Sequence, residues 1–137
     1  MGLVLDSGVL IAAERDAKPV SEVLTTLEHE HGETEIVLSS ITVIELEHGL
    51  HRAQTAEQER IRREYLDTVF AAIPVEPFTR EMAQLAAKID AEARRAGRMI
   101  PFPDLLIGVT ALHFGYAIGT RNLRHFQMVP NLAVIQL

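Results

Sequence analysis

The chain has 137 residues, of which 47% are hydrophobic and 23% are charged, and its 13 basic and 19 acidic residues give a net charge of −6. This composition predicts one soluble globular domain, residues 1–137, with enough length to bury a core. The lack of cysteine excludes disulfides, thiol chemistry and cysteine-ligated metal sites. The acidic balance counts against nucleic-acid binding, which needs local positive potential.

No stretch of the chain predicts export or membrane insertion. The first residues, MGLVLDSGV, have no basic region before the apolar ones, unlike a secretory signal. The longest uncharged run, Leu105–Thr120, is too short for a transmembrane helix, which needs about 20 apolar residues. We therefore expect a cytoplasmic protein with no membrane contact.

Short apolar runs alternate with helical patterns along the whole chain. The predicted strands are compact runs bounded by polar residues, glycine or proline: Gly2–Asp6, Glu35–Ser39, Val75–Glu76, Tyr116–Thr120 and Ala133–Leu137. The predicted helices follow a capping residue or a proline: one capped by Ser7 to about Arg15, Val20–His31 after Pro19, Ile41–Ala53 after Ser40, one after Thr55 to about Ile73, one capped by Thr79 to about Ala96, and Pro103 to Gly115. This alternation predicts an α/β sandwich around a mainly parallel sheet of four to five short strands.

The stretch IPFPDLLIGVTALHFGYAIGTRNLRHF, from Ile100 to Phe126, is the strongest indication of a functional site. Its one acid, Asp104, stands in the first turn of a buried helix, where an acid also favours the helix dipole. The following strand leads into the polar turn Thr120-Arg121-Asn122. An acid at the start of a buried helix, beside a strand that ends in a polar turn, indicates a site.

Four polar residues are expected at the carboxyl edge of this sheet, where ligands bind in open parallel α/β folds. Asp6 ends the first strand, Glu45 lies one turn into the helix after the second strand, Asp104 opens the buried helix, and Asn122 follows the fourth strand. Three converging carboxylates need a cation, and Mg²⁺ or Mn²⁺ prefers oxygen ligands. Such an ion activates water and neutralises charge on a phosphate. Singly, each acid also has a structural explanation: a helix cap for Asp6, an arginine partner for Glu45 and the helix dipole for Asp104.

The motifs VLDSGVLIA, SSITVIELEHGL and IPFPDLLIGVTAL with GTRNLRHF resemble, in this order, the PIN-domain proteins, and among them the VapC type of toxin. The resemblance spans almost the whole chain. It implies a PIN-like three-layer α/β/α sandwich and an Mg²⁺- or Mn²⁺-dependent endoribonuclease that leaves a 5′-phosphate and a 3′-hydroxyl. It also implies a homodimer, the toxin of a type II toxin–antitoxin pair, restrained by a VapB-like antitoxin.

Carried over by position, the resemblance implies that the catalytic and metal-binding acids are Asp6, Glu45 and Asp104. Asn122 occupies a fourth position that is often aspartate in the family, and the Thr120 hydroxyl matches the position before it. Asparagine offers an oxygen but no charge, so this departure makes the occupancy of a second metal ion an open question.

The RNA substrate implied by this resemblance needs basic contacts on an acidic protein. Arg98 precedes Asp104, and Arg121 and Arg124 flank Asn122, so we expect these three arginines to hold phosphates at the entrance to the site. Arg94 and Arg95 are equally well explained as basic residues at a helix carboxyl terminus.

Three alternatives to a ribonuclease remain open. The first is a binding module with this fold, weakened catalytically by Asn122, that acts through an antitoxin or RNA partner; Val9, Leu10, Val23 and Leu27 then receive the antitoxin or belong to the core. The Glu-x-x-His spacings of Glu28–His31 and Glu45–His48 are typical of di-iron helix bundles, but a predicted strand separates them. Asp6-Ser7-Gly8 also has the position of an aspartyl-phosphate site, yet it lacks a second acid two residues on.

Overall fold

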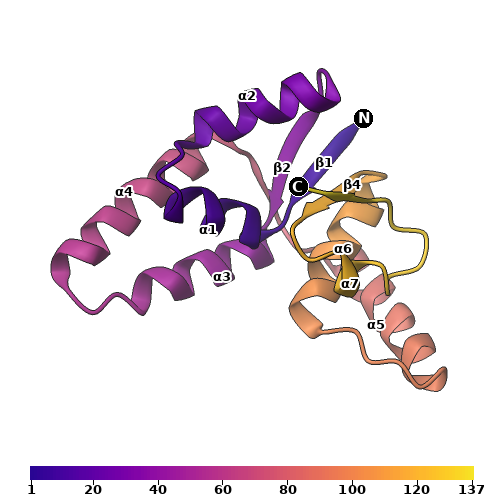
Figure 1. Ribbon diagram of the computed structural model, residues 1–137. Coiled ribbons are helices and arrows are strands. Elements are labelled where there is room, and N and C mark those ends of the chain that lie inside the picture. The colour runs from indigo at the N-terminus through magenta and orange to yellow at the C-terminus, as the bar shows by residue number, and fades with distance from the viewer.

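The computed structural model describes residues 1–137 as a five-stranded sheet with helices on both faces (Figure 1). The strands are β1 (Gly2–Leu5), β2 (Glu35–Ser39), β3 (Val75–Glu76), β4 (Ala117–Thr120) and β5 (Val134–Gln136). They lie in the order β3-β2-β1-β4-β5, and every neighbouring pair is parallel. The predicted three-layer α/β/α fold is confirmed, with the first strand at the centre of the sheet.

Seven helices cover the two faces of the sheet. They are α1 (Ser7–Arg15), α2 (Val20–His31), α3 (Ser40–His51), α4 (Ala56–Ala72), α5 (Arg80–Arg95), α6 (Phe102–Phe114) and α7 (Leu123–Phe126). In Figure 1 the helices α1 to α4 lie on one side of the sheet and α5 to α7 on the other. The sequence predicts six of them, with ends that differ by one or two residues, but not the four-residue α7. None of the helices combines the length and apolarity needed to span a bilayer.

The central strand β1 connects the cores on the two faces of the sheet. Leu3 and Leu5 pack into one cluster with residues of α1, α2, α3 and α4, whereas Val4 packs with Ile107 of α6 and Phe126 of α7. Successive side chains of a strand point to opposite faces, and here both faces are covered. This is why the first strand is apolar at every position rather than alternating.

Two helices begin one residue earlier than the sequence indicates, because the capping residues are Asp6 and Ser39 rather than Ser7 and Ser40. Asp6 Oδ1 accepts from the Ser7 amide at 2.9 Å, and Ser39 Oγ accepts from the Ile41 amide at 3.1 Å. The helix α1 is therefore capped by the residue directly after β1, and α3 by the last residue of β2. As a consequence, the hydroxyls of Ser7 and Ser40 are free to bond elsewhere in the fold.

The end of α6 and the strand β4 depend on two glycines. Gly115 ends α6 with φ of 68°, in the left-handed region that glycine adopts without strain. Gly119 in β4 has no room for a side chain, because a Cβ there would lie 2.8 Å from Leu137 and 3.2 Å from Leu3. The close packing of β4 places Thr120 and the turn after it beside the end of β1.

Candidate active site

Asp6 stands at the carboxyl end of β1 and is only 8% exposed. Its backbone amide donates to the Gly119 carbonyl at 2.9 Å, so the ends of β1 and β4 are held together. Its Oδ1 caps α1, while its Oδ2 accepts a hydrogen bond from Thr120 Oγ1 at 2.9 Å. The capping role of Asp6 considered from the sequence is therefore real. It uses Oδ1, while Oδ2 lies beside the end of β4.

Glu45 lies on α3 and is bonded to the start of α1. The Ser7 hydroxyl donates to Glu45 Oε1 at 3.0 Å. No arginine pairs with Glu45; Arg63 instead binds Glu47 with two hydrogen bonds of 2.9 and 2.6 Å. The explanation of Glu45 as half of an ion pair is therefore wrong, and its carboxylate stays available at the sheet edge.

Asp104 in the first turn of α6 is bonded to a histidine of α7. Its Oδ2 lies 2.7 Å from His125 Nδ1, and the same nitrogen lies 2.9 Å from Asn122 Nδ2. The Asn122 backbone amide donates to Thr120 Oγ1 at 2.9 Å. A continuous series of contacts at hydrogen-bond distance thus runs from Asp6 through Thr120 and Asn122 to His125 and Asp104.

Burial and mutual repulsion raise the pKa of two of the three acids. Burial raises the pKa of Asp6, and repulsion from Asp104 adds to this, against the hydrogen bonds from Thr120 and Ser7. Burial also raises the pKa of Glu45, with Asp6 and Asp104 contributing repulsion against the Ser7 hydrogen bond. Each of these two acids therefore responds to the charge of the other predicted acids, which indicates that all three share one region of low solvent access.

The donor set fits a hard divalent cation. All the candidate ligands present oxygen, three of them as carboxylates, and a cation would relieve the repulsion among them. The structure nevertheless contains no tight group of three or more aspartate, glutamate or histidine side chains around one point. Mg²⁺ keeps several of its waters and binds few carboxylates directly, so it does not require such a group.

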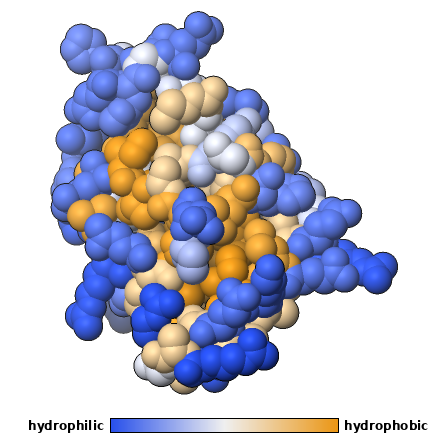
Figure 2. All heavy atoms as spheres, turned by 90° about the vertical axis from the view of Figure 1, so that its right-hand side faces the viewer, coloured by the Kyte–Doolittle hydropathy of each residue, from blue (hydrophilic) through white to orange (hydrophobic).

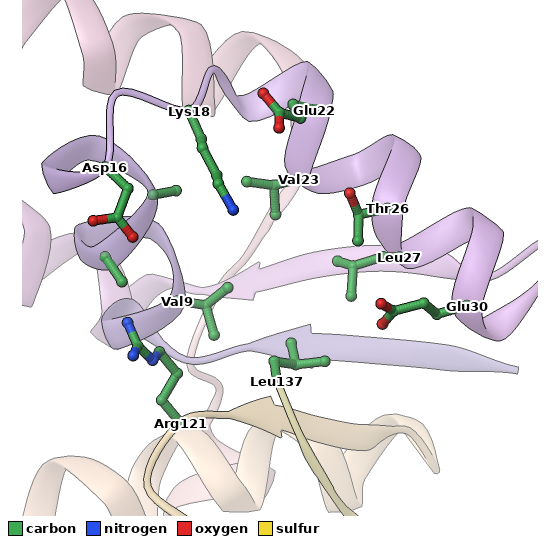
Figure 3. Close-up of a pocket in the computed structure, with 12 residues that line it drawn as sticks. Val9, Asp16, Lys18, Glu22, Val23, Thr26, Leu27, Glu30, Arg121 and Leu137 are labelled. Atoms are coloured by element: carbon green, nitrogen blue, oxygen red, sulfur yellow. The ribbon is translucent and has the colours of Figure 1, made fainter.

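The three arginines predicted to hold phosphates are exposed and lie on three different segments of the fold. Arg98 lies in the loop between α5 and α6, and Arg124 lies in α7. Arg121 extends into a cavity between α1 and α2, where Lys18 approaches from the opposite side (Figure 3). Arg121 is therefore placed to contact a molecule bound over α1 and α2.

A second hollow, of about 370 Å³, contains Glu45 itself and lies between α1, α3 and α4. Two arginines that the sequence analysis did not single out, Arg52 and Arg62, line it. Arg62 also donates to the Gly49 carbonyl at 2.7 Å, which fixes α4 to α3. This hollow brings positive charge closer to a predicted catalytic acid than the net charge of the chain suggests.

Two further residues of the site escaped the sequence analysis: Ser7, which was interpreted as a cap, and His125. The signal for His125 is its spacing of three residues after Asn122, which places the two side chains on one face of a short helix. The Glu-x-x-His spacings of the sequence involve other histidines, His31 and His48.

These observations define a class of protein: a parallel α/β fold with buried and half-buried carboxylates at the carboxyl edge of its sheet. The PIN domain family model matches residues 3–131, and the chain belongs to this family. It is 28% identical over 135 residues to "Ribonuclease VapC" of Rickettsia bellii, an alignment that covers 98% of this chain and 96% of that protein. It is 32% identical over 130 residues to "VapC ribonuclease Y4jK" of Sinorhizobium fredii, covering 91% and 90%. The resemblance to the VapC type is confirmed.

Solved structures share the fold over the whole chain. The VapBC2 complex of Rickettsia felis, bound to a DNA fragment from its promoter, superposes with a TM-score of 0.85 at 20% identity and covers 100% of this chain and 99% of that one. DNA-bound VapBC from Salmonella typhimurium gives a TM-score of 0.83 at 20% identity, covering 99% and 98%. At these identities the likeness establishes the fold alone.

Proposed function

We propose that this protein is an Mg²⁺- or Mn²⁺-dependent endoribonuclease, the toxin of a type II toxin–antitoxin pair. The observation that carries the proposal is the gathering of Asp6, Glu45 and Asp104 at one edge of the sheet, where burial and mutual repulsion raise the pKa of the first two. The relatives named VapC ribonucleases support the same activity. A carboxylate site of this kind suits hydrolysis of a phosphodiester.

In this proposal Asp6, Glu45, Asp104 and Asn122 hold the divalent cation. The bound ion supplies a water nucleophile at neutral pH and neutralises charge that develops on the phosphate. The side chains around it supply orientation: Thr120 donates to Asp6 at 2.9 Å and Ser7 donates to Glu45 at 3.0 Å. Glu45 keeps Oε2 without a hydrogen bond, whereas each oxygen of Asp6 accepts one bond and retains a second lone pair for the ion.

The proposed RNA substrate passes over the acids with its phosphates held by arginines. Arg52 and Arg62 line the hollow that contains Glu45, and we assign them to one side of the path. Arg98 and Arg124, exposed beside the start of α6 and on α7, are assigned to the other. Such contacts bind any sequence, so the choice of target RNA depends on shape and on bases.

The proposed antitoxin partner has a receptive surface between α1 and α2. A cavity of about 350 Å³ there is lined by Val9, Val23 and Leu27 and is entered by Lys18 and Arg121 (Figure 3). Apolar anchors beside mixed charges suit a peptide segment with an apolar side chain and polar flanks. Leu10, the fourth residue considered for this role, is fully buried in the core.

We also propose a homodimer formed through α5 and α6. Figure 2 shows this side of the molecule, where apolar residues gather at the centre and polar residues surround them. Met99 and Phe102, in and next to the connection between the two helices, are 66% and 64% exposed. Contiguous apolar surface of this kind usually marks an interface.

Cleavage of RNA by purified protein tests the proposed activity. Wild type is expected to cut structured RNA with Mg²⁺ or Mn²⁺ and to lose activity with a chelator. Asp6→Asn and Asp104→Asn should each lower the rate by at least about a hundredfold, whereas Asp67→Asn, on the exposed face of α4, should not. Binding without ion-dependent cleavage of any RNA would contradict this function. It would favour the binding module instead, for which the uncharged Asn122 is the supporting observation.

A further inference from the structure

His125 contacts two of the proposed ion ligands at once. It sits on α7, directly before Phe126, whose ring is fully buried among residues of β1, β2, β4 and α6. The buried Phe126 ring holds α7 in place directly after the turn that follows β4. The imidazole itself remains partly exposed and reaches Asp104 Oδ2 at 2.7 Å and Asn122 Nδ2 at 2.9 Å.

Both contacts use the same ring nitrogen, Nδ1, so the direction of each hydrogen bond limits what His125 can do. A ring nitrogen carries either one proton or one lone pair in the ring plane, so it serves one in-plane partner at a time. A carboxylate only accepts, so Nδ1 must donate to Asp104; an amide nitrogen only donates, so Nδ1 must accept from Asn122. His125 therefore orients one ligand or the other, according to its tautomer and the orientation of the Asn122 amide.

The substitution of asparagine for a carboxylate makes this contact important. An aspartate at position 122 would be attracted to a cation by its charge, whereas an amide must present its oxygen and turn its nitrogen away. His125 is the side chain that receives the amide nitrogen in the structure. No other side chain forms hydrogen bonds with both Asp104 on α6 and Asn122 after β4.

We propose that His125 is a positioning residue, which orients Asp104 or Asn122 through Nδ1 according to its tautomer and so supports the ion site that this chain has with only three acids. The inference rests on the proposed function and adds to it a residue that touches neither the ion nor the RNA. Partners of this kind typically change metal affinity by about 10- to 100-fold.

Two variants of His125 separate the hydrogen bond from the volume of the ring. His125→Phe keeps the ring and removes Nδ1, while His125→Asn retains a polar atom close to the position of Nδ1. His113→Phe is the matched control, because His113 is exposed near the end of α6 and stacks edge-on against Phe114. Circular dichroism and the melting temperature in chelator should show that all three variants are folded.

The Mn²⁺ affinity, measured by calorimetry without RNA, gives the first readout. His125→Phe should weaken Mn²⁺ binding by about 10- to 100-fold, His125→Asn should recover most of this loss, and His113→Phe should match wild type. Wild-type affinity in His125→Phe, or an equal loss in both His125 variants, would overturn the proposal.

A second readout needs neither ion nor RNA. In ¹⁵N spectra of the chelated protein, the His125 ring nitrogens should shift on Asp104→Asn and on Asn122→Ala, and those of His113 should not. Unchanged His125 nitrogens in both variants would overturn the positioning role. Failure of the proposed function has a different signature, because wild type would then bind no Mn²⁺ while these nitrogen shifts remained.

Discussion

The Ser7 hydroxyl donates to Glu45 Oε1 at 3.0 Å, across 38 positions of sequence, and joins the start of α1 to α3. Ser7→Ala removes this bond and leaves Glu45 free to change rotamer. We expect Mg²⁺ affinity to fall about tenfold, with little change in stability. Calorimetric titration with Mg²⁺ measures the effect. Ser21→Ala, on the exposed side of α2, is the control, and an equal loss in both variants would contradict the assignment.

The raised pKa of Glu45 predicts how stability depends on pH. Burial is the main cause, and it means that the folded protein holds this proton more tightly than the unfolded chain does. Without an ion, the free energy of unfolding therefore falls as pH rises from the unfolded pKa through the raised folded pKa. Glu45→Gln avoids this loss and keeps the acceptor for Ser7.

In chelator at pH 7, Glu45→Gln should accordingly be more stable than wild type, since the amide is not charged on burial. At a pH below the unfolded pKa of glutamate the two proteins should unfold alike. Denaturant unfolding at the two pH values measures both differences. A variant that is less stable than wild type at pH 7 would show that the carboxylate is not strained.

Asn122→Asp restores the charge that the family resemblance leads one to expect. A fourth carboxylate should strengthen Mg²⁺ binding about tenfold, since one more charge near the ion contributes on the order of 1–2 kcal/mol. The same charge should lower the melting temperature in chelator, because it adds repulsion to Asp6 and Asp104. Thermal unfolding with and without Mg²⁺ measures both changes. A gain of stability in chelator would be the contrary outcome.

Replacement of two exposed apolar residues tests the dimer. Met99→Glu combined with Phe102→Glu should give a protein with the mass of one 15.2 kDa chain, while wild type should have the mass of two. Both side chains are more than half exposed, so the fold should be retained. Light scattering after size-exclusion chromatography measures the mass. A dimeric double variant would place the interface elsewhere.

Much of the fold is predictable from the sequence because its signals are local. The five apolar runs become strands within one or two residues, and Gly115 ends α6 as expected. The helix α7 was missed because four residues are too few to show a helical period. Its stability comes from the burial of Phe126, a tertiary effect that no local pattern displays.

The site is predictable in its acids and less so in the bonds between them. Asp6 follows a strand and Asp104 opens a helix, and both positions can be inferred along the chain. The Ser7 hydroxyl can reach Glu45 only because Asp6, and not Ser7, caps α1. The sequence offers both residues as caps and does not decide between them. The direction of Arg121, into the cavity over α1 and α2, depends on how β4 meets those helices in space.

The central position of β1 also governs when the site is assembled. The first strand pairs with β4, and the bond from Thr120 to Asp6 spans 114 positions of sequence. During synthesis the amino-terminal part emerges first, with one edge of β1 still unpaired. Such distant pairing is slow to form. The order of synthesis thus keeps Asp6 apart from Thr120 and Asn122 until the chain is almost complete, so a growing polypeptide carries no finished site.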